Sequence, residues 1–152
     1  MDASVLIAYI GEEPGRADTV AALLEDARQG RVKLLTSVLS VTEVAYGAEE
    51  AAGGLTAEGE AAIDKLWEPA SPMTIVDVSQ ALTRAGRGLI RAAKQRQVSA
   101  PGSIDALHLA TAVLHGCKEI FTYEKEATRT KWAAATGLPI SEPYVDEPPL
   151  SF

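Results

Sequence analysis

Apolar residues follow two periods along the chain, and each period predicts a different element. Between residues 17 and 28 they recur at three- and four-residue spacing, which predicts a helix that Gly30 ends. The stretch MTIVDV at residues 73–78 is instead rich in β-branched residues and predicts a strand. Residues 3–10, ASVLIAYI, are almost continuously apolar after an acid, which is typical of a buried strand end that runs into a helix.

The other elements lie between breaks rich in glycine and proline. The pattern predicts strands at residues 32–35 and 119–122, helices at residues 56–67, 80–96, 103–115 and 125–136, and one more helix that Ser37 or Ser40 caps and that ends before Gly53. Because strands alternate with helices, we expect an α/β fold, with one three-layer α/β/α domain over residues 1–152 and a central parallel sheet. The tail at 141–152, SEPYVDEPPLSF, is too rich in proline for a regular element, and we expect it to run extended over the surface.

Composition narrows the class of protein. The chain has 152 residues, 47% hydrophobic and 23% charged, which is the length and balance of one soluble domain with its own core. Cys117 is its single cysteine, so no intramolecular disulfide can form. No apolar stretch is long enough to span a bilayer, and the first residues lack the pattern of a signal peptide, so we expect a cytoplasmic protein.

The net charge of -7 argues against nucleic-acid binding by the whole surface, since phosphate binding depends on a positive field. Any contact with RNA must therefore be local. One basic stripe stands out, because its members are three, four and three positions apart on the helix predicted at 80–96: Arg84, Arg87, Arg91 and Lys94. Such a stripe is a solvated face, a surface that contacts RNA phosphate, or a docking surface for an acidic partner segment.

Four acids fall at similar places in the predicted fold. Asp2 and Glu124 come just past predicted strands, and Glu43 and Asp105 lie in the first turns of predicted helices. In open α/β sheets ligands bind beyond the carboxyl ends of the strands, where these positions converge. Hard divalent cations prefer oxygen ligands, so the four acids are candidates for one metal site.

Each acid also has a structural explanation when it is taken alone. The helix dipole favours acidic residues in the first turn of a helix, and this explains Asp105, two positions after Ser103. Ser40 and Glu43 fit the S-x-x-E capping box, in which the two side chains bond to the backbone at the start of a helix. Only the joint position of the acids at one edge of a sheet favours a functional interpretation.

Four sequence blocks, in their order along the chain, resemble those of the PIN-domain family. They are DASVLI at residues 2–7, VTEV at 41–44, SIDALHLATA at 103–112 and IFTYE at 120–124. The resemblance covers essentially the whole chain, and the block around Asp105 is the most specific. It implies a ribonuclease fold with an acidic pocket for Mg²⁺ or Mn²⁺, often in a VapC-like toxin of a toxin–antitoxin pair.

The resemblance also implies roles for single residues and for partners. It assigns six side chains: Asp2 and Asp105 as main metal ligands, Glu43 as a ligand or water-organising carboxylate, Glu124 as the fourth acid, and Ser4 and Thr122 to orient them. The implied chemistry is metal-assisted hydrolysis of RNA phosphodiesters. The implied partners are a small antitoxin protein and a second copy of the chain in a homodimer.

The chain departs from the family pattern in two places. The last block usually has Asp where this chain has Glu124, and Glu126 is a second acid close by. Several apolar residues usually precede the first Asp and form the strand that presents it, whereas here Met1 directly precedes Asp2. Either this strand is short or its residues lie outside the sequence.

His108 lies three positions after Asp105 on the same helix face. We expect it to be hydrogen-bonded near the core rather than a metal ligand, because the other candidate ligands are hard carboxylates. Two alternative functions stay open. In a phosphatase or phosphotransfer domain Asp2 would be the nucleophile, but Asp2-Ala3-Ser4 lacks the second acid of a D-x-D block. A PIN fold without catalytic activity would serve as an interaction module.

Overall fold

The predicted α/β fold with parallel strands is confirmed. The computed structural model describes residues 1–47, 50 and 53–145. The helices are α1 (Ala3–Ile10), α2 (Arg16–Arg28), α3 (Leu39–Glu43), α5 (Ala57–Asp64), α6 (Gln80–Gln95), α7 (Ser103–Leu114) and α8 (Glu126–Thr136). The strands are β1 (Leu34–Ser37), β2 (Met73–Val76), β3 (Ile120–Phe121) and β4 (Ile140–Ser141), and β1 pairs with β2 and β3 with β4, both in parallel.

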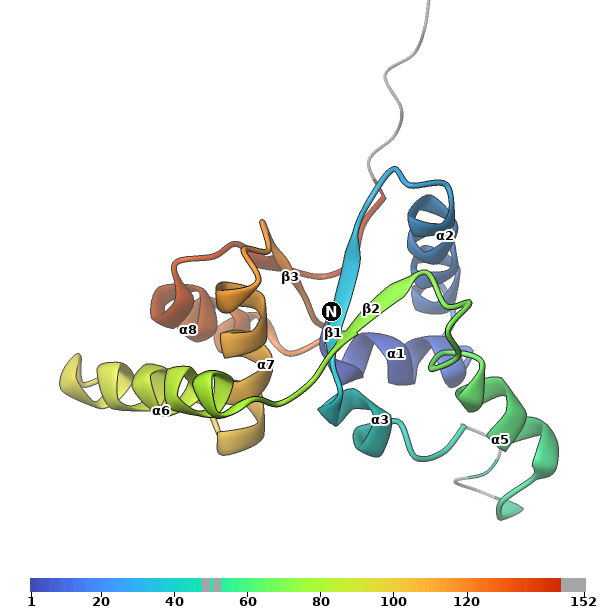
Figure 1. Ribbon diagram of the computed structural model, residues 1–152, viewed down its shortest axis with the longest axis horizontal. Coiled ribbons are helices and arrows are strands. Elements are labelled where there is room, and N and C mark those ends of the chain that lie inside the picture. The colour runs from blue at the N-terminus through green and yellow to red at the C-terminus, as the bar shows by residue number, and fades with distance from the viewer. Residues whose placement is uncertain (48–49, 51–52, 146–152) are drawn as a thin grey trace, which may run out of the picture.

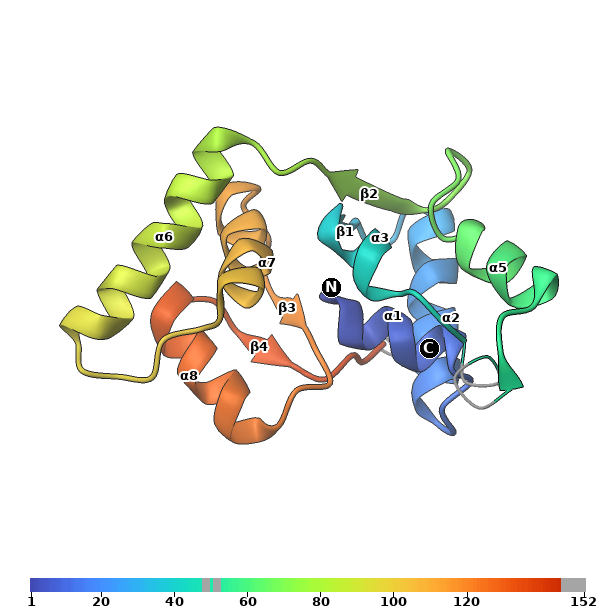
Figure 2. The same cartoon turned by 90° about the horizontal axis from the view of Figure 1, so that it is seen from below.

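The helices form two groups on either side of the central strand β1. Figure 1 shows α1, α2, α3 and α5 on one side and α6, α7 and α8 on the other. The first residues of the chain lie between α3 and α7 in the view from below (Figure 2). Among the described helices, none is both long and apolar enough to cross a membrane.

Residues 3–10 are entirely helical, so the prediction that they contain the end of a strand was wrong. The Asp2 side chain accepts a hydrogen bond from the Ser4 amide and thereby caps the helix. Val5 and Leu6 are both fully buried, because α1 packs against neighbours on more than one side. A continuous apolar run of this length fits a buried helix as well as a buried strand, and only the tertiary packing distinguishes the two.

Two other predicted elements need correction. The helix predicted after Ser37 is only five residues long, and part of its expected range, residues 48–49 and 51–52, lies outside the described residues. The tail predicted to lack regular structure begins with Ser141, which belongs to β4 and pairs with Phe121 of β3. Pairing with β3 satisfies the backbone of Ser141, and no local pattern indicates that partner.

Met1 and Asp2 connect the two pairs of strands. The Met1 amino group donates to the Leu35 carbonyl of β1 at 2.7 Å, and the Asp2 amide donates to the Phe121 carbonyl of β3 at 3.1 Å. Adjacent residues thus bond to opposite sides, as in an extended strand. A groove of about 790 Å³ continues from this point between β1 and β3, with Met1, Leu35 and Phe121 among its lining residues. Burial lowers the pKa of the Met1 amino group.

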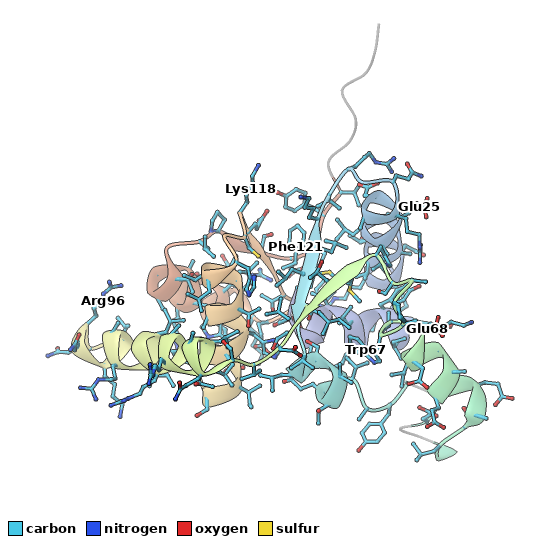
Figure 3. All side chains as sticks on the ribbon, viewed as in Figure 1. Glu25, Trp67, Glu68, Arg96, Lys118 and Phe121 are labelled. Atoms are coloured by element: carbon cyan, nitrogen blue, oxygen red, sulfur yellow. The ribbon has the colours of Figure 1, made fainter. Side chains whose placement is uncertain are left out.

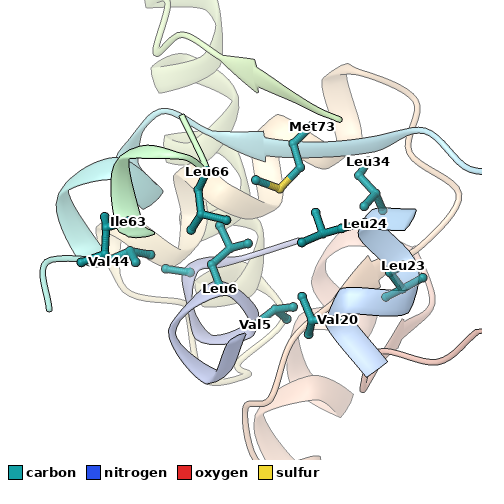
Figure 4. Close-up of a cluster of buried hydrophobic side chains, with 11 residues drawn as sticks. Val5, Leu6, Val20, Leu23, Leu24, Leu34, Val44, Ile63, Leu66 and Met73 are labelled. Atoms are coloured by element: carbon teal, nitrogen blue, oxygen red, sulfur yellow. The ribbon is translucent and has the colours of Figure 1, made fainter. Parts of the chain in front are cut away.

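The largest core lies between α1, α2, β1 and β2. Figure 4 shows Leu6, Val20, Leu24 and Met73 in this cluster, all of them buried. Each such side chain stabilises the fold by about 1.5–3 kcal/mol when fully buried. This core holds α1 in place and therefore fixes the position of Asp2 at its start.

Helices α6 and α7 pack closely against each other. A Cβ atom added at Gly86 of α6 would lie 3.2 Å from the Ala106 carbonyl oxygen of α7. Glycine at this position therefore allows the two backbones to approach. The approach places α6 beside the first turn of α7, which carries Asp105.

Candidate functional site

Asp2 is a buried carboxylate held by three hydrogen-bond donors. The residue is 9% exposed, and its Oδ1 accepts from the Ser4 amide at 3.1 Å and from Ser4 Oγ at 2.7 Å. Its Oδ2 accepts from Thr122 Oγ1 at 2.6 Å. Burial of a charge is costly unless it is hydrogen-bonded, and here the start of α1 also faces the carboxylate with its positive end. These donors therefore hold the Asp2 carboxylate in one orientation.

The segment after β3 is tied to the same carboxylate. Ser4 Oγ accepts from the Tyr123 amide at 2.9 Å, and Thr122 Oγ1 accepts from the Glu124 amide at 3.1 Å. Glu124 is thus connected to Asp2 through its backbone, while the residue itself is exposed. Glu126 is also exposed, in the first turn of α8. Glu124 is therefore linked to Asp2 by its amide, through the Thr122 hydroxyl, and its carboxylate takes no part in this link.

Glu43 contacts a histidine instead of capping a helix. It is the last residue of α3, and its Oε2 lies 2.6 Å from His108 Nε2 on α7. The predicted capping box is wrong, because Val38 precedes the helix and Ser40 is buried inside it. The Ser40 hydroxyl lies 2.8 Å from Thr36 Oγ1, which itself donates to the Met1 carbonyl. Since Thr36 has one hydroxyl proton, Ser40 must be the donor in this pair.

Asp105 lies in the first turn of α7 and is half-buried. Its Oδ2 accepts from the Gly102 amide at 3.2 Å, and Gly102 is the residue that precedes the helix. His108 follows one turn later on the same helix. The expectation that His108 is hydrogen-bonded near the core is confirmed, since its side chain is 9% exposed and contacts Glu43.

A small cavity connects these elements. Its volume is about 20 Å³, and both Asp2 and His108 line it, together with Thr36, Ser37 and Thr111. Asp2 at the start of α1 and His108 of α7 therefore face the same cavity, and His108 in turn contacts Glu43 of α3. Asp105 lies one turn before His108 on α7, and neither Asp105 nor Glu43 lines the cavity itself.

The carboxylates fit a hard divalent cation by their chemistry, because such ions take a few oxygen ligands and keep several waters. They do not form a closed cage. Within the described part of the chain, no three His, Cys, Asp or Glu side chains gather closely enough to hold a metal ion. Asp2, Glu43 and Asp105 instead each contact a hydrogen-bonding group of the protein itself. No sequence pattern indicates the contact between Glu43 and His108, because the two residues are 65 positions apart.

The basic stripe predicted from the sequence is exposed along α6. Arg84, Arg87, Arg91 and Lys94 are all exposed, and none of them takes part in an ion pair with another described residue. Figure 3 shows nitrogen-tipped side chains along this helix. Because α6 packs against the first half of α7, the stripe lies on the helix next to the one that carries Asp105.

We predict that the hydroxyl of Thr122 is required to keep Asp2 in place. Thr122→Val removes the donor to Oδ2 with little change in the volume of the side chain, and a lost hydrogen bond to a charged group costs about 1.5–3 kcal/mol. Urea unfolding should show a loss of this size, whereas Thr122→Ser, which keeps the hydroxyl, should lose much less. Equal stabilities of the Val and Ser variants would contradict this role.

The chain matches a known family over most of its length. The family model described as PIN domain matches residues 1–133. The matched range includes all four candidate acids. A search of curated proteins finds no match.

Proposed function

Since the chain belongs to the PIN-domain family, we propose that it is a metal-dependent endoribonuclease that hydrolyses RNA phosphodiesters at Asp2, Glu43, Asp105 and Glu124. The observation that carries the proposal is the buried carboxylate of Asp2, which lies across one small cavity from the His108–Glu43 pair. Asp2 has donors from two separate segments, and they fix the direction of both of its oxygens.

Each acid has a distinct proposed task. Asp2 and Asp105 would hold Mg²⁺ or Mn²⁺, with Glu43 as a further ligand or as the carboxylate that orients a water, and Glu124 as the fourth acid. When bound, the cation supplies Lewis-acid polarisation of the phosphodiester and a more acidic bound water. Ser4 and Thr122 keep the Asp2 carboxylate in one orientation. Glu126 is a reserve candidate for the place of Glu124.

One observation favours the alternative that the fold serves as an inactive interaction module. Glu124 reaches the site through its amide and is exposed, whereas a fourth acid needs its carboxylate there. Measurements of cleavage by the wild-type protein separate this alternative from the nuclease. An inactive module should bind its partner with unchanged affinity when Asp105 is replaced.

We predict that Asp105→Asn lowers the rate of RNA cleavage more than about 100-fold. Loss of a residue that only hydrogen-bonds to a metal ligand already costs about 10–100-fold in activity, and Asp105 is proposed as a ligand itself. The amide oxygen can still accept from Gly102, so the fold should be retained. Cleavage of a panel of structured RNAs should stop with a chelator and return with Mg²⁺ or Mn²⁺. The control is Asp64→Asn at the exposed end of α5, which should cleave normally. Full activity of the Asp105 variant would refute the proposal.

The biological role that we propose is that of a toxin of a type II toxin–antitoxin pair, acting on RNA in the cytoplasm. The protein would form a homodimer, and a small antitoxin would inhibit it by inserting a basic side chain toward the acids. Arginine pairs with carboxylates in a bidentate geometry, so an acidic site attracts it as readily as a cation.

This role predicts that expression of the protein alone stops growth and that a small protein encoded beside it restores growth and copurifies with it. Light scattering of the free protein should give twice the mass of the 16.0 kDa chain. The Asp105→Asn variant should be harmless yet still bind the antitoxin. A catalytically active protein that is harmless at high expression would remove the toxin role and leave the nuclease.

We also propose that the stripe on α6 guides RNA toward the carboxylates. Contacts between basic side chains and phosphates release counterions, with a salt slope of about 0.7 per contact on single strands. The double variant Arg87→Gln and Arg91→Gln should therefore bind RNA more weakly, with a flatter salt dependence, and cleave normally at saturation. The matched control, Arg28→Gln with Arg31→Gln on and after α2, removes the same charge elsewhere. An unchanged slope would make the stripe a solvated face, and loss of antitoxin binding alone would make it a docking surface.

A further inference from the structure

His108 lies between two of the candidate acids, Glu43 and Asp2. Its Nε2 lies 2.6 Å from Glu43 Oε2, and this contact joins α7 to α3 across 65 residues of sequence. The imidazole is 9% exposed and the Glu43 side chain 36% exposed, so the contact lies at the boundary between the interior and the surface. A hydrogen bond at this depth restricts both side chains more than a contact in open solvent would.

The geometry determines which ring nitrogen carries the proton in the neutral imidazole. An ionised carboxylate can only accept, so Nε2 must donate to Glu43. Nδ1 is then an acceptor. It is buried, and no described residue gives it a hydrogen-bond partner. A buried polar atom without a partner is costly, and such atoms in folded proteins are usually paired with protein or with water.

The cavity beside His108 is large enough for one water molecule. Its volume is about 20 Å³, and a water needs about 10–15 Å³ and two to four polar partners. Its lining includes polar side chains from the strand end and from α7, namely Thr36, Ser37 and Thr111, as well as Asp2. An apolar cavity of this size would stay dry, whereas this one is lined by polar side chains on several sides.

We propose that His108 is a positioning residue: it holds the Glu43 carboxylate through Nε2–H, and a buried water bound to Nδ1 fills the cavity next to Asp2. Glu43 on α3 and Asp2 at the start of α1 are thereby set relative to each other by one side chain of α7. One consequence rests on the proposed function, namely that His108 preorganises Glu43 to bind a cation. Hydrogen bonds to ligating carboxylates orient them in this way.

Two substitutions separate this role from simple packing. The amide nitrogen of His108→Gln can reach the place of Nε2 and donate to Glu43, whereas the shorter His108→Asn cannot. Calorimetric titration with Mn²⁺ should show about 10–100-fold weaker binding for the Asn variant. The Gln variant should bind close to the wild type. With RNA, the Asn variant should lower kcat and leave KM unchanged, because the stripe on α6 is intact. Wild-type Mn²⁺ affinity in the Asn variant would overturn the positioning role.

The contact itself has a test that needs neither metal nor RNA. The ¹⁵N spectrum of the imidazole should show a protonated Nε2 and an unprotonated Nδ1 that accepts a hydrogen bond. A protonated Nδ1 in the neutral ring would overturn the assignment, and a Nδ1 that accepts no bond would overturn the water. The unfolding equilibrium constants of Glu43→Gln, His108→Asn and the double variant should be non-additive by at least about threefold.

These measurements distinguish the two proposals. If the wild type binds no Mn²⁺ and cleaves no RNA, the nuclease function fails, while the spectrum and the unfolding cycle still decide whether His108 holds Glu43. The other outcome is that the wild type binds Mn²⁺ and cleaves RNA while the effects of the Glu43 and His108 substitutions on the free energy of unfolding are additive. In that case the nuclease function stands and the positioning role is wrong.

Discussion

Two consecutive backbone hydrogen bonds at Met1 and Asp2 join the two pairs of parallel strands, and the position of the site depends on them. Strands β1 and β2 form one two-stranded sheet, and β3 and β4 form another. A two-stranded pair has little stability of its own, so the bonds that bridge the two sheets matter for both. The bridge also starts α1, so it places the carboxylate of Asp2 between the ends of β1 and β3. Thr36 strengthens it from the side of β1 by donating to the Met1 carbonyl.

The environment of Asp2 shows how the fold tolerates a charge at this junction. A buried carboxylate is stable only if donors replace the water that it loses, and the cost of an unpaired one is several kcal/mol. Ser4 and Thr122 supply these donors from two segments that are 118 residues apart. The same donors leave the carboxylate in one orientation, so stability and preorganisation have a common origin. The chain remains acidic overall, with a net charge of -7, and its ordered basic stripe is on α6.

Helix α7 combines three tasks because of its periodicity. Asp105 in its first turn accepts from the backbone of Gly102, His108 one turn later contacts Glu43, and Ala106 between them meets Gly86 of α6. Residues three apart share a face, whereas the residue between them points elsewhere. One short segment thus carries one candidate acid, contacts a second acid on α3 and packs against the basic helix α6.

The sequence by itself determined the elements with strong local patterns and the identity of the candidate acids. The helices predicted at 17–28, 80–96 and 103–115 match α2, α6 and α7 to within two residues, and the four PIN-like blocks singled out the acids as a set. Tertiary structure alone decided that residues 3–10 are helical, that Ser141 belongs to β4, and that Glu43 meets His108. Local periodicity reports only which face of a segment is apolar. These three outcomes depend instead on contacts between residues far apart in the chain, which form only when the core brings their elements together.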